Sequence, residues 1–245
     1  MTARLQRFSF RLIAIPLLAA LLAAGLAGCG GLLSDAPKRE LYRVSPKFAF
    51  PAGLPHVGAQ LLVATPIAAG GLDTERIALS RAPLALDYLA DAQWADRVPY
   101  LVQTSLVEGF EKSAAIPAVG PDRGGLRADF VLETAIGDFT AIYDSPNGPP
   151  RISVRLTAKL VRMPERTIVA EIAVTREANA AANAVPEIVR AFEAALGGAI
   201  SEVVTWTLRN PALANHAPTD RTLSNRRGSV ISWTRFVHAA GSTEP

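Results

Sequence analysis

Residues 151–174, RISVRLTAKLVRMPERTIVAEIAV, decide the fold class of this chain. Apolar and polar side chains alternate in two runs, as in strands with one buried and one solvated face. The apolar positions are Ile152, Val154, Leu156, Ala158 and Leu160 in the first run, and Ile168, Ala170, Ile172 and Val174 in the second. Only residues 163–166 separate the runs, so we predict an antiparallel hairpin.

The segment before this hairpin predicts a third strand with one irregularity. Its apolar residues are Phe130, Leu132, Ile136, Phe139 and Ala141, whose spacing shifts by one position after Gly137. One extra residue moves every later side chain to the opposite face of a strand. We therefore predict a β-bulge at Gly137 and Asp138, with two shorter strands meeting there as the alternative.

Two other segments carry apolar residues at helical spacing. In residues 97–112 these are Val98, Leu101, Val102, Leu106 and Phe110. Pro99 fits the first turn of that helix, where its missing N–H has no partner to lose. Residues 185–208 predict a longer helix, in which Gly197 and Gly198 indicate either close contact with the sheet or a kink.

Shorter apolar runs predict strands at residues 41–44, 61–63 and 77–79, with a proline-rich loop at 46–58. Trp94 is interpreted as a packing residue. Two amphipathic helices and a sheet with one apolar face bury that face together. We therefore predict an α+β two-layer sandwich, a mainly antiparallel sheet with both long helices on one face, formed by a domain at residues 41–208.

The first 28 residues have the layout of a secretory signal peptide. Arg4, Arg7 and Arg11 precede an apolar segment at residues 12–26, which small residues follow. A membrane-spanning helix needs roughly 20 apolar residues, more than this segment holds, so a permanent span is not expected.

The chain has a single cysteine, so Cys29 has no intrachain disulfide partner. Residues 26–29, Leu-Ala-Gly-Cys, resemble the lipobox of bacterial lipoproteins. The resemblance implies cleavage between Gly28 and Cys29 and attachment of fatty acyl chains, such as palmitate, to Cys29. Two or more acyl chains give stable membrane attachment. An ordinary secreted protein with a cysteine near the cleavage site is the alternative.

Gly30 follows Cys29, where lipoproteins retained at the inner membrane usually carry aspartate. The resemblance therefore favours the periplasmic face of the outer membrane, with inner-membrane retention as the alternative. Residues 29–40 are polar and contain Pro37, and we expect them to form a tether.

The net charge of +3 does not indicate a nucleic-acid partner. The signal peptide alone carries three arginines and no acidic residue, so the mature chain is neutral overall. Residues 209–245 carry +3 and are expected to form a low-order basic tail, with residues 230–236 as a possible short strand. The domain itself therefore lacks the positive charge that phosphate binding needs.

No pattern in the sequence indicates catalysis. The histidines are His56, His216 and His238, all in predicted loop or tail. A catalytic base needs fixed geometry, which such segments do not provide. The carboxylate pairs at helical spacing are Asp87 with Asp91 and Glu108 with Glu111. Such pairs are common on helix surfaces, and the nucleophile, zinc and phosphate motifs are absent. We expect a protein that is not an enzyme and holds no metal or cofactor beyond its covalent lipid.

A binding role remains. Arg151, Arg155 and Lys159 lie on the polar face of the first hairpin strand and are the candidate residues for contact with an acidic partner. A solvated face that serves solubility is the alternative.

The order of the segments carries a resemblance to a known family. The segments are LLVATPIAAGGLDTERIALSRAP at 61–83, WADRVPYLVQTSLVEGFEKS at 94–113, ADFVLETAIGDF at 128–139, the hairpin, and EVVTW at 202–206. With the lipobox, this order resembles the ABC-type transport auxiliary lipoprotein family, whose members accompany MCE-domain lipid transporters in Gram-negative bacteria. The resemblance spans about residues 26–208, and only Cys29 is carried over as a functional position.

The resemblance implies a non-catalytic adaptor that docks the MCE channel of an ABC lipid transporter at the outer membrane. Two alternatives stay open. One is a periplasmic lipoprotein that binds lipid or a small ligand in a cleft between helices and sheet, and the other is an envelope-assembly lipoprotein.

Overall fold

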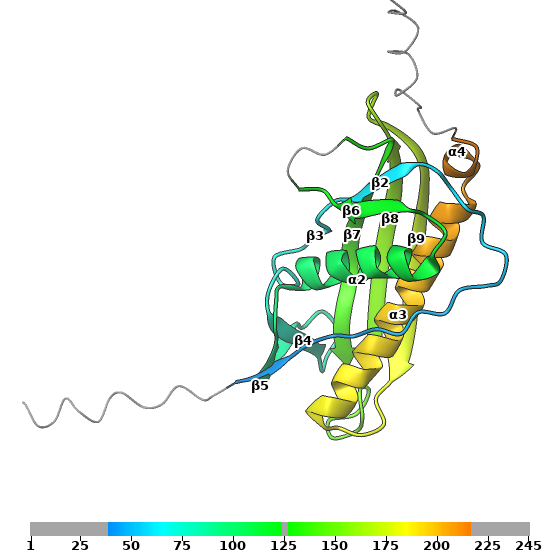
Figure 1. Ribbon diagram of the computed structural model, residues 1–245. Coiled ribbons are helices and arrows are strands. Elements are labelled where there is room, and N and C mark those ends of the chain that lie inside the picture. Colours follow the sequence, from blue (N-terminus) through cyan, green and yellow to red (C-terminus); the bar gives the residue numbers. More distant parts are fainter. Residues whose placement is uncertain (1–38, 124–126, 217–245) are drawn as a thin grey trace, which may run out of the picture. The chain divides into compact units, whose positions relative to one another are not determined.

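A computed structural model describes residues 39–123 and 127–216 (Figure 1). The strands are β1 (Glu40–Tyr42), β2 (Gln60–Val63), β3 (Ile67–Ala68), β4 (Arg76–Ser80), β5 (Asp87–Trp94), β6 (Ala118–Pro121), β7 (Phe130–Ile142), β8 (Arg151–Arg162) and β9 (Thr167–Asn179). The helices are α2 (Val98–Ser113), α3 (Val185–Arg209) and α4 (Pro211–Ala214). The predicted α+β class and both long helices are confirmed.

The predicted hairpin is the antiparallel pair β8–β9, and β7 pairs antiparallel with β8 on the other side. Along the opposite edge of β7 lie β2, β3 and β4, all parallel to it, and β6 pairs parallel with β2. The sheet is therefore mixed, and the prediction of a mainly antiparallel sheet missed its parallel half. Parallel pairs need long crossover connections, whose course local alternation does not encode.

The predicted bulge is confirmed. Ile136 lies opposite Leu156 and Asp138 opposite Arg155, so Gly137 is the extra residue within one continuous strand. The alternative of two short strands is therefore wrong.

A second register shift, in the β8–β9 pair, was not predicted. Ala170 lies opposite Leu160 and Ile168 opposite Val161, so Val169 is the extra residue. Val169 packs against the core while Ile168 is 54% exposed. The prediction that Ile168 lies on the apolar face is therefore wrong, because the shift places it on the other face.

Figure 1 shows α2 and α3 crossing the same side of the sheet. Helix α3 contacts β8 and β9, whereas α2 contacts β2, β6 and α3. Between helix and sheet, Trp94 meets Phe192 edge-on at 5.1 Å between ring centroids and Phe139 at 5.9 Å. All three rings are fully buried, so the role of Trp94 as a packing residue is confirmed.

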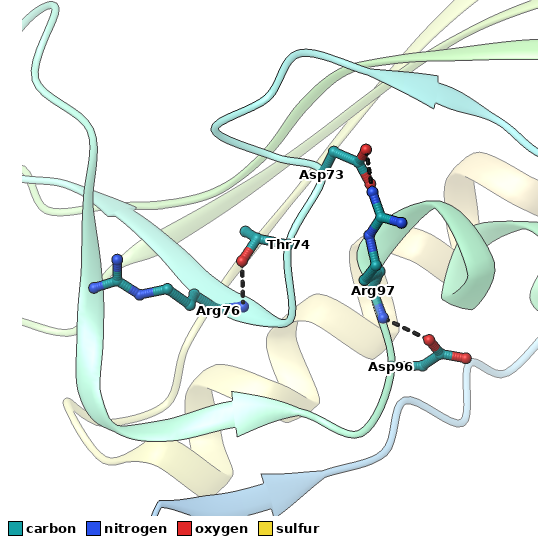
Figure 2. A network of polar contacts seen from close by, with 5 residues as sticks. All are labelled: Asp73, Thr74, Arg76, Asp96 and Arg97. Carbon is teal, nitrogen blue, oxygen red and sulfur yellow. Dashed lines mark hydrogen bonds and ion pairs between the residues drawn. The ribbon is translucent and has the colours of Figure 1, made fainter.

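The start of α2 is fixed by a turn at residues 73–76 (Figure 2). The Arg97 guanidinium pairs with the Asp73 carboxylate, and the Val98 N–H donates to the Thr74 carbonyl at 3.1 Å. Within the helix, Gln103 is only 2% exposed and its side-chain amide donates to the Val63 carbonyl at 2.9 Å. The helix is therefore tied to β2 by a buried polar contact that its apolar pattern did not indicate.

The packed core continues beyond residue 208, where the predicted domain ends. Residues Pro211–Ala214 form α4, and Leu213 is fully buried. The predicted low-order tail is therefore wrong for its first residues. Residues 217–245, including the possible strand at 230–236, lie outside the described residues.

Candidate functional site

The three cationic residues chosen from the sequence lie on the solvent side of β8, as predicted. Arg151 pairs with Glu177 of β9 at 2.5 Å, and Lys159 lies 3.8 Å from Glu171, also on β9. The Arg155 guanidinium is 3.4 Å from the Gly137 carbonyl at the bulge. The positive charges of Arg151 and Lys159 are therefore matched by acidic side chains on the neighbouring strand, which weakens the case for an acidic partner at this face.

Exposed ion pairs of this kind contribute about 0–1 kcal/mol to stability. These pairs therefore do little to hold the hairpin together. They do keep the open face of the β8–β9 hairpin close to electrical neutrality.

The histidines are placed differently from expectation. His56 is exposed in the 46–58 segment, as predicted, and His238 lies outside the described residues. His216 is not a solvated tail residue: its Nε2 is 3.3 Å from Asp129, and its ring meets Phe130 edge-on at 5.3 Å. The prediction for His216 is therefore wrong, because α4 carries it back to the start of β7.

The carboxylate pairs do not form a common centre. Asp87 and Asp91 lie on strand β5, so their helical interpretation is wrong. Glu108 lies on α2 and pairs with Lys112 at 3.6 Å. Within residues 39–123 and 127–216, no group of three or more His, Cys, Asp and Glu side chains is arranged to hold a metal ion.

Cys29, the predicted lipid-attachment residue, lies outside the described residues. Among the helices that the structure describes, none combines the length and apolar character needed to cross a bilayer.

An open groove of about 820 Å³ lies beside α3. Its walls include Lys47 and Ala49 from the 46–58 segment, Ile172 and Arg176 from β9, and Gly198, Ser201, Glu202, Thr205 and Trp206 from α3. An ion pair of 2.5 Å between Arg176 and Glu202 joins β9 to α3 across it. The groove thus combines an aromatic ring, small residues and a paired charge.

The wall formed by the 46–58 segment is held in place by hydrogen bonds to α3. The Ser201 hydroxyl accepts the Ala49 N–H at 3.1 Å and donates to the Gly197 carbonyl at 2.7 Å. The Ser45 N–H donates to the Glu193 carboxylate at 2.9 Å. These contacts bind an otherwise irregular segment to the helix, so this side of the groove is preformed.

The other side of the groove is a sheet edge. Within the part of the chain that the structure describes, β9 pairs only with β8, so its outer backbone edge is unpaired. Sequence reasoning missed the groove, although one signal was present. Small residues recur on one face of α3, at Ala194, Gly198, Ser201 and Thr205. Residues three or four apart are neighbours on a helix, so these short side chains leave room for a groove along that face.

Comparison with known proteins identifies the family of this chain. A sequence model described as the ABC-type transport auxiliary lipoprotein component matches residues 45–204. The chain belongs to the ABC-type transport auxiliary lipoprotein family. The match begins in the segment that lines the groove and ends within α3, so it covers nearly all of the described fold. The resemblance noted in the sequence is thereby confirmed.

Solved structures share the fold of this auxiliary lipoprotein. The crystal structure of protein XCC0632 from Xanthomonas campestris is 30% identical, covers 69% of this chain and 94% of its own, and superimposes with a TM-score of 0.65. A crystal structure of an uncharacterized protein, 14% identical, covers 68% of this chain and 97% of its own with a TM-score of 0.52, a likeness of fold alone.

An uncharacterized protein of Bradyrhizobium diazoefficiens, bll6063, is 29% identical over 155 residues. That alignment covers 62% of this auxiliary lipoprotein but 40% of the relative. The chain therefore spans two fifths of the length of this longer relative.

Proposed function

We propose that this protein is a lipid-anchored periplasmic adaptor of an ABC/MCE-type lipid transport system, that it is not an enzyme, and that it docks the MCE-domain protein at the outer membrane. The observation that carries the proposal is the family match over residues 45–204, downstream of a lipobox-like segment that ends in Cys29. An auxiliary component of a transport system has to reach both its membrane and its partner. A lipid anchor followed by a tether and a folded domain provides this arrangement.

The partner is tested by affinity purification of the full chain from detergent-solubilised membranes. Recovery of an MCE-domain protein together with the ATPase and permease is the expected result. A Cys29→Ser variant, purified in parallel, shows whether recovery needs the anchor. Intact lipidated protein that brings down none of these components would contradict the adaptor role.

The anchor and its location have separate tests. Cys29→Ser is expected to release the protein from membranes into the soluble fraction. Gly30→Asp is expected to move it from outer-membrane to inner-membrane fractions, because it introduces the aspartate that inner-membrane lipoproteins usually carry after the lipidated cysteine. If the wild-type protein already fractionates with the inner membrane, the proposed location is wrong while the anchor stands.

A second candidate function is favoured by the groove beside α3. A volume of about 820 Å³ with Trp206, Ile172 and the Arg176–Glu202 pair has the size and mixed lining of a small-ligand site. Mass spectrometry of the purified protein would then find a co-purifying phospholipid or other small molecule. Thr205→Arg, which fills the groove, is expected to remove that ligand, whereas a pure adaptor carries none in either protein.

A further inference from the structure

An apolar hairpin tip projects from the sheet, and Leu84 at its end has no place in the packed core. Residues 81–86 connect β4 to β5, and after Arg81 the stretch 82–86, Ala-Pro-Leu-Ala-Leu, is uncharged. Leu84 is fully exposed, at 109% of the reference accessibility for leucine, and Leu86 is 47% exposed. Among the described residues, Leu84 is the most exposed of the large apolar side chains.

The backbone of the tip is also strained at Leu84. Leu84 has a φ of 65°, in the left-handed region that a leucine rarely adopts. Neither the backbone conformation nor the exposed side chain stabilises the domain in water. Strain at such a position is a sign of a role outside the fold.

The base of the tip, by contrast, is well supported. Leu86 packs so closely on Gly71 that a β-carbon there would lie 2.6 Å from its Cδ2. The Tyr88 hydroxyl donates to the Gly71 carbonyl at 3.0 Å, and the Arg76 guanidinium stacks on the Tyr88 ring at 3.7 Å. Leu84 is therefore presented at the end of a supported hairpin.

The tip belongs to the edge of the sheet that begins with the first strand, β1. The strand order there is β1, β5, β4, so the first strand and the β4–β5 hairpin are neighbours. Leu41 on β1 is itself 65% exposed. Ten residues lie between Cys29 and Glu40, and the eleven Cα-to-Cα steps span up to about 38 Å when extended, more than the roughly 26 Å length of β5.

We propose that the hairpin tip, with Leu84 at its end, inserts into the interface of the bilayer that holds the acyl chains of Cys29. This inference rests on the proposed lipid anchor. A single leucine gives weak binding by itself. The anchor, however, keeps the bilayer at a high effective concentration, so a small apolar contact is enough to orient the domain. Arg81 follows β4 at the base of the tip, 3.8 Å from Asp87, and is the cation of this hairpin that lies where lipid phosphates would be.

The test places a fluorophore at the tip. Once Cys29 is lipidated, Leu84→Cys supplies the only free thiol of the full chain and is labelled with a polarity-sensitive dye. Ile168→Cys is the matched control, because Ile168 is an exposed apolar residue on β9, at the opposite edge of the sheet. Both lipidated proteins are reconstituted into phosphatidylethanolamine and phosphatidylglycerol vesicles that contain a nitroxide quencher on the acyl chains.

We expect a blue shift and quenching at position 84 and neither at position 168. Equal emission at the two positions overturns the inference, as does shielding of position 84 only when the transporter proteins are added. Intact mass of the same samples distinguishes a failure of the proposed insertion from a failure of the proposed anchor. A lipidated protein with a solvent-exposed tip contradicts the insertion alone, whereas a protein without lipid contradicts the anchor and the insertion together.

Discussion

The carbonyl oxygen of Lys47 lies directly against Gly197 of α3, so that a β-carbon at this glycine would be 2.3 Å from it. The contact joins residues 150 positions apart and lets an extended segment run along the helix. The second glycine, Gly198, faces β9 instead, where a β-carbon would lie 3.5 Å from the Arg176 side chain. Adjacent glycines in one helix therefore have different structural roles.

Gly197→Ala is expected to destabilise the domain by about 1–3 kcal/mol. Alanine favours a helix over glycine by about 1 kcal/mol, but here its methyl group collides with backbone that cannot rotate away. Chemical denaturation of the purified protein measures the change.

Gly198→Ala is the matched control, since its methyl group meets only ordinary contact distances. It is expected to leave stability unchanged or raise it by up to about 1 kcal/mol. Equal effects of the two substitutions would show that the Lys47 contact does not constrain position 197.

Leu213→Ala tests whether α4 belongs to the folded domain. Leu213 is fully buried, so its truncation is expected to cost about 2–5 kcal/mol. Leu84→Ala makes the same chemical change at a fully exposed position and is expected to change stability by less than about 0.5 kcal/mol. If Leu213→Ala were as mild as Leu84→Ala, the domain would end before α4.

Phe192→Ala tests the aromatic cluster between α3 and the sheet. The ring of Phe192 lies 4.8 Å from that of Phe139 and 5.1 Å from that of Trp94, so its loss leaves a large cavity. We expect a loss of about 3–5 kcal/mol and a red shift of tryptophan emission as water approaches Trp94. Phe192→Leu, which keeps most of the volume, is expected to lose less than about 1.5 kcal/mol and to leave the emission unshifted.

Tyr143→Phe tests a pH dependence. Burial raises the pKa of Tyr143 above its ordinary value of 10.0, and the nearby Arg81 partly opposes this. The folded state therefore keeps the phenol proton at a pH where the unfolded chain has lost it, so stability falls as the pH rises above about 10. The variant lacks this component, and its stability is expected to fall less steeply in that range.

At neutral pH the same substitution removes only the hydrogen bond of 2.9 Å from the Tyr143 hydroxyl to Asn183. The expected cost is about 0.5–1.5 kcal/mol, near the lower end because Asn183 is exposed. Urea denaturation of both proteins at neutral pH and above pH 10 gives the two quantities. Parallel pH curves for the two proteins would contradict the raised pKa.

The sequence by itself determined the local elements and the proposed anchor. Alternation over residues 151–174 predicted the β8–β9 hairpin, and a one-residue phase shift located the bulge at Gly137. These features depend on neighbours along the chain, whose side-chain period is set by backbone geometry. The Leu-Ala-Gly-Cys segment is similarly a local pattern, so the prediction for Cys29 needs no tertiary contact.

Only the tertiary structure decided the features that involve distant segments. The parallel strands along β7, the packing of His216 on Phe130, the groove beside α3 and the exposed Leu84 all follow from how separate elements meet. Leu84 and Leu213 each lie in a short apolar stretch that contains a proline, yet Leu213 is buried and Leu84 is fully exposed. Burial depends on which surfaces the folded chain brings together, and that information lies in no single stretch of sequence.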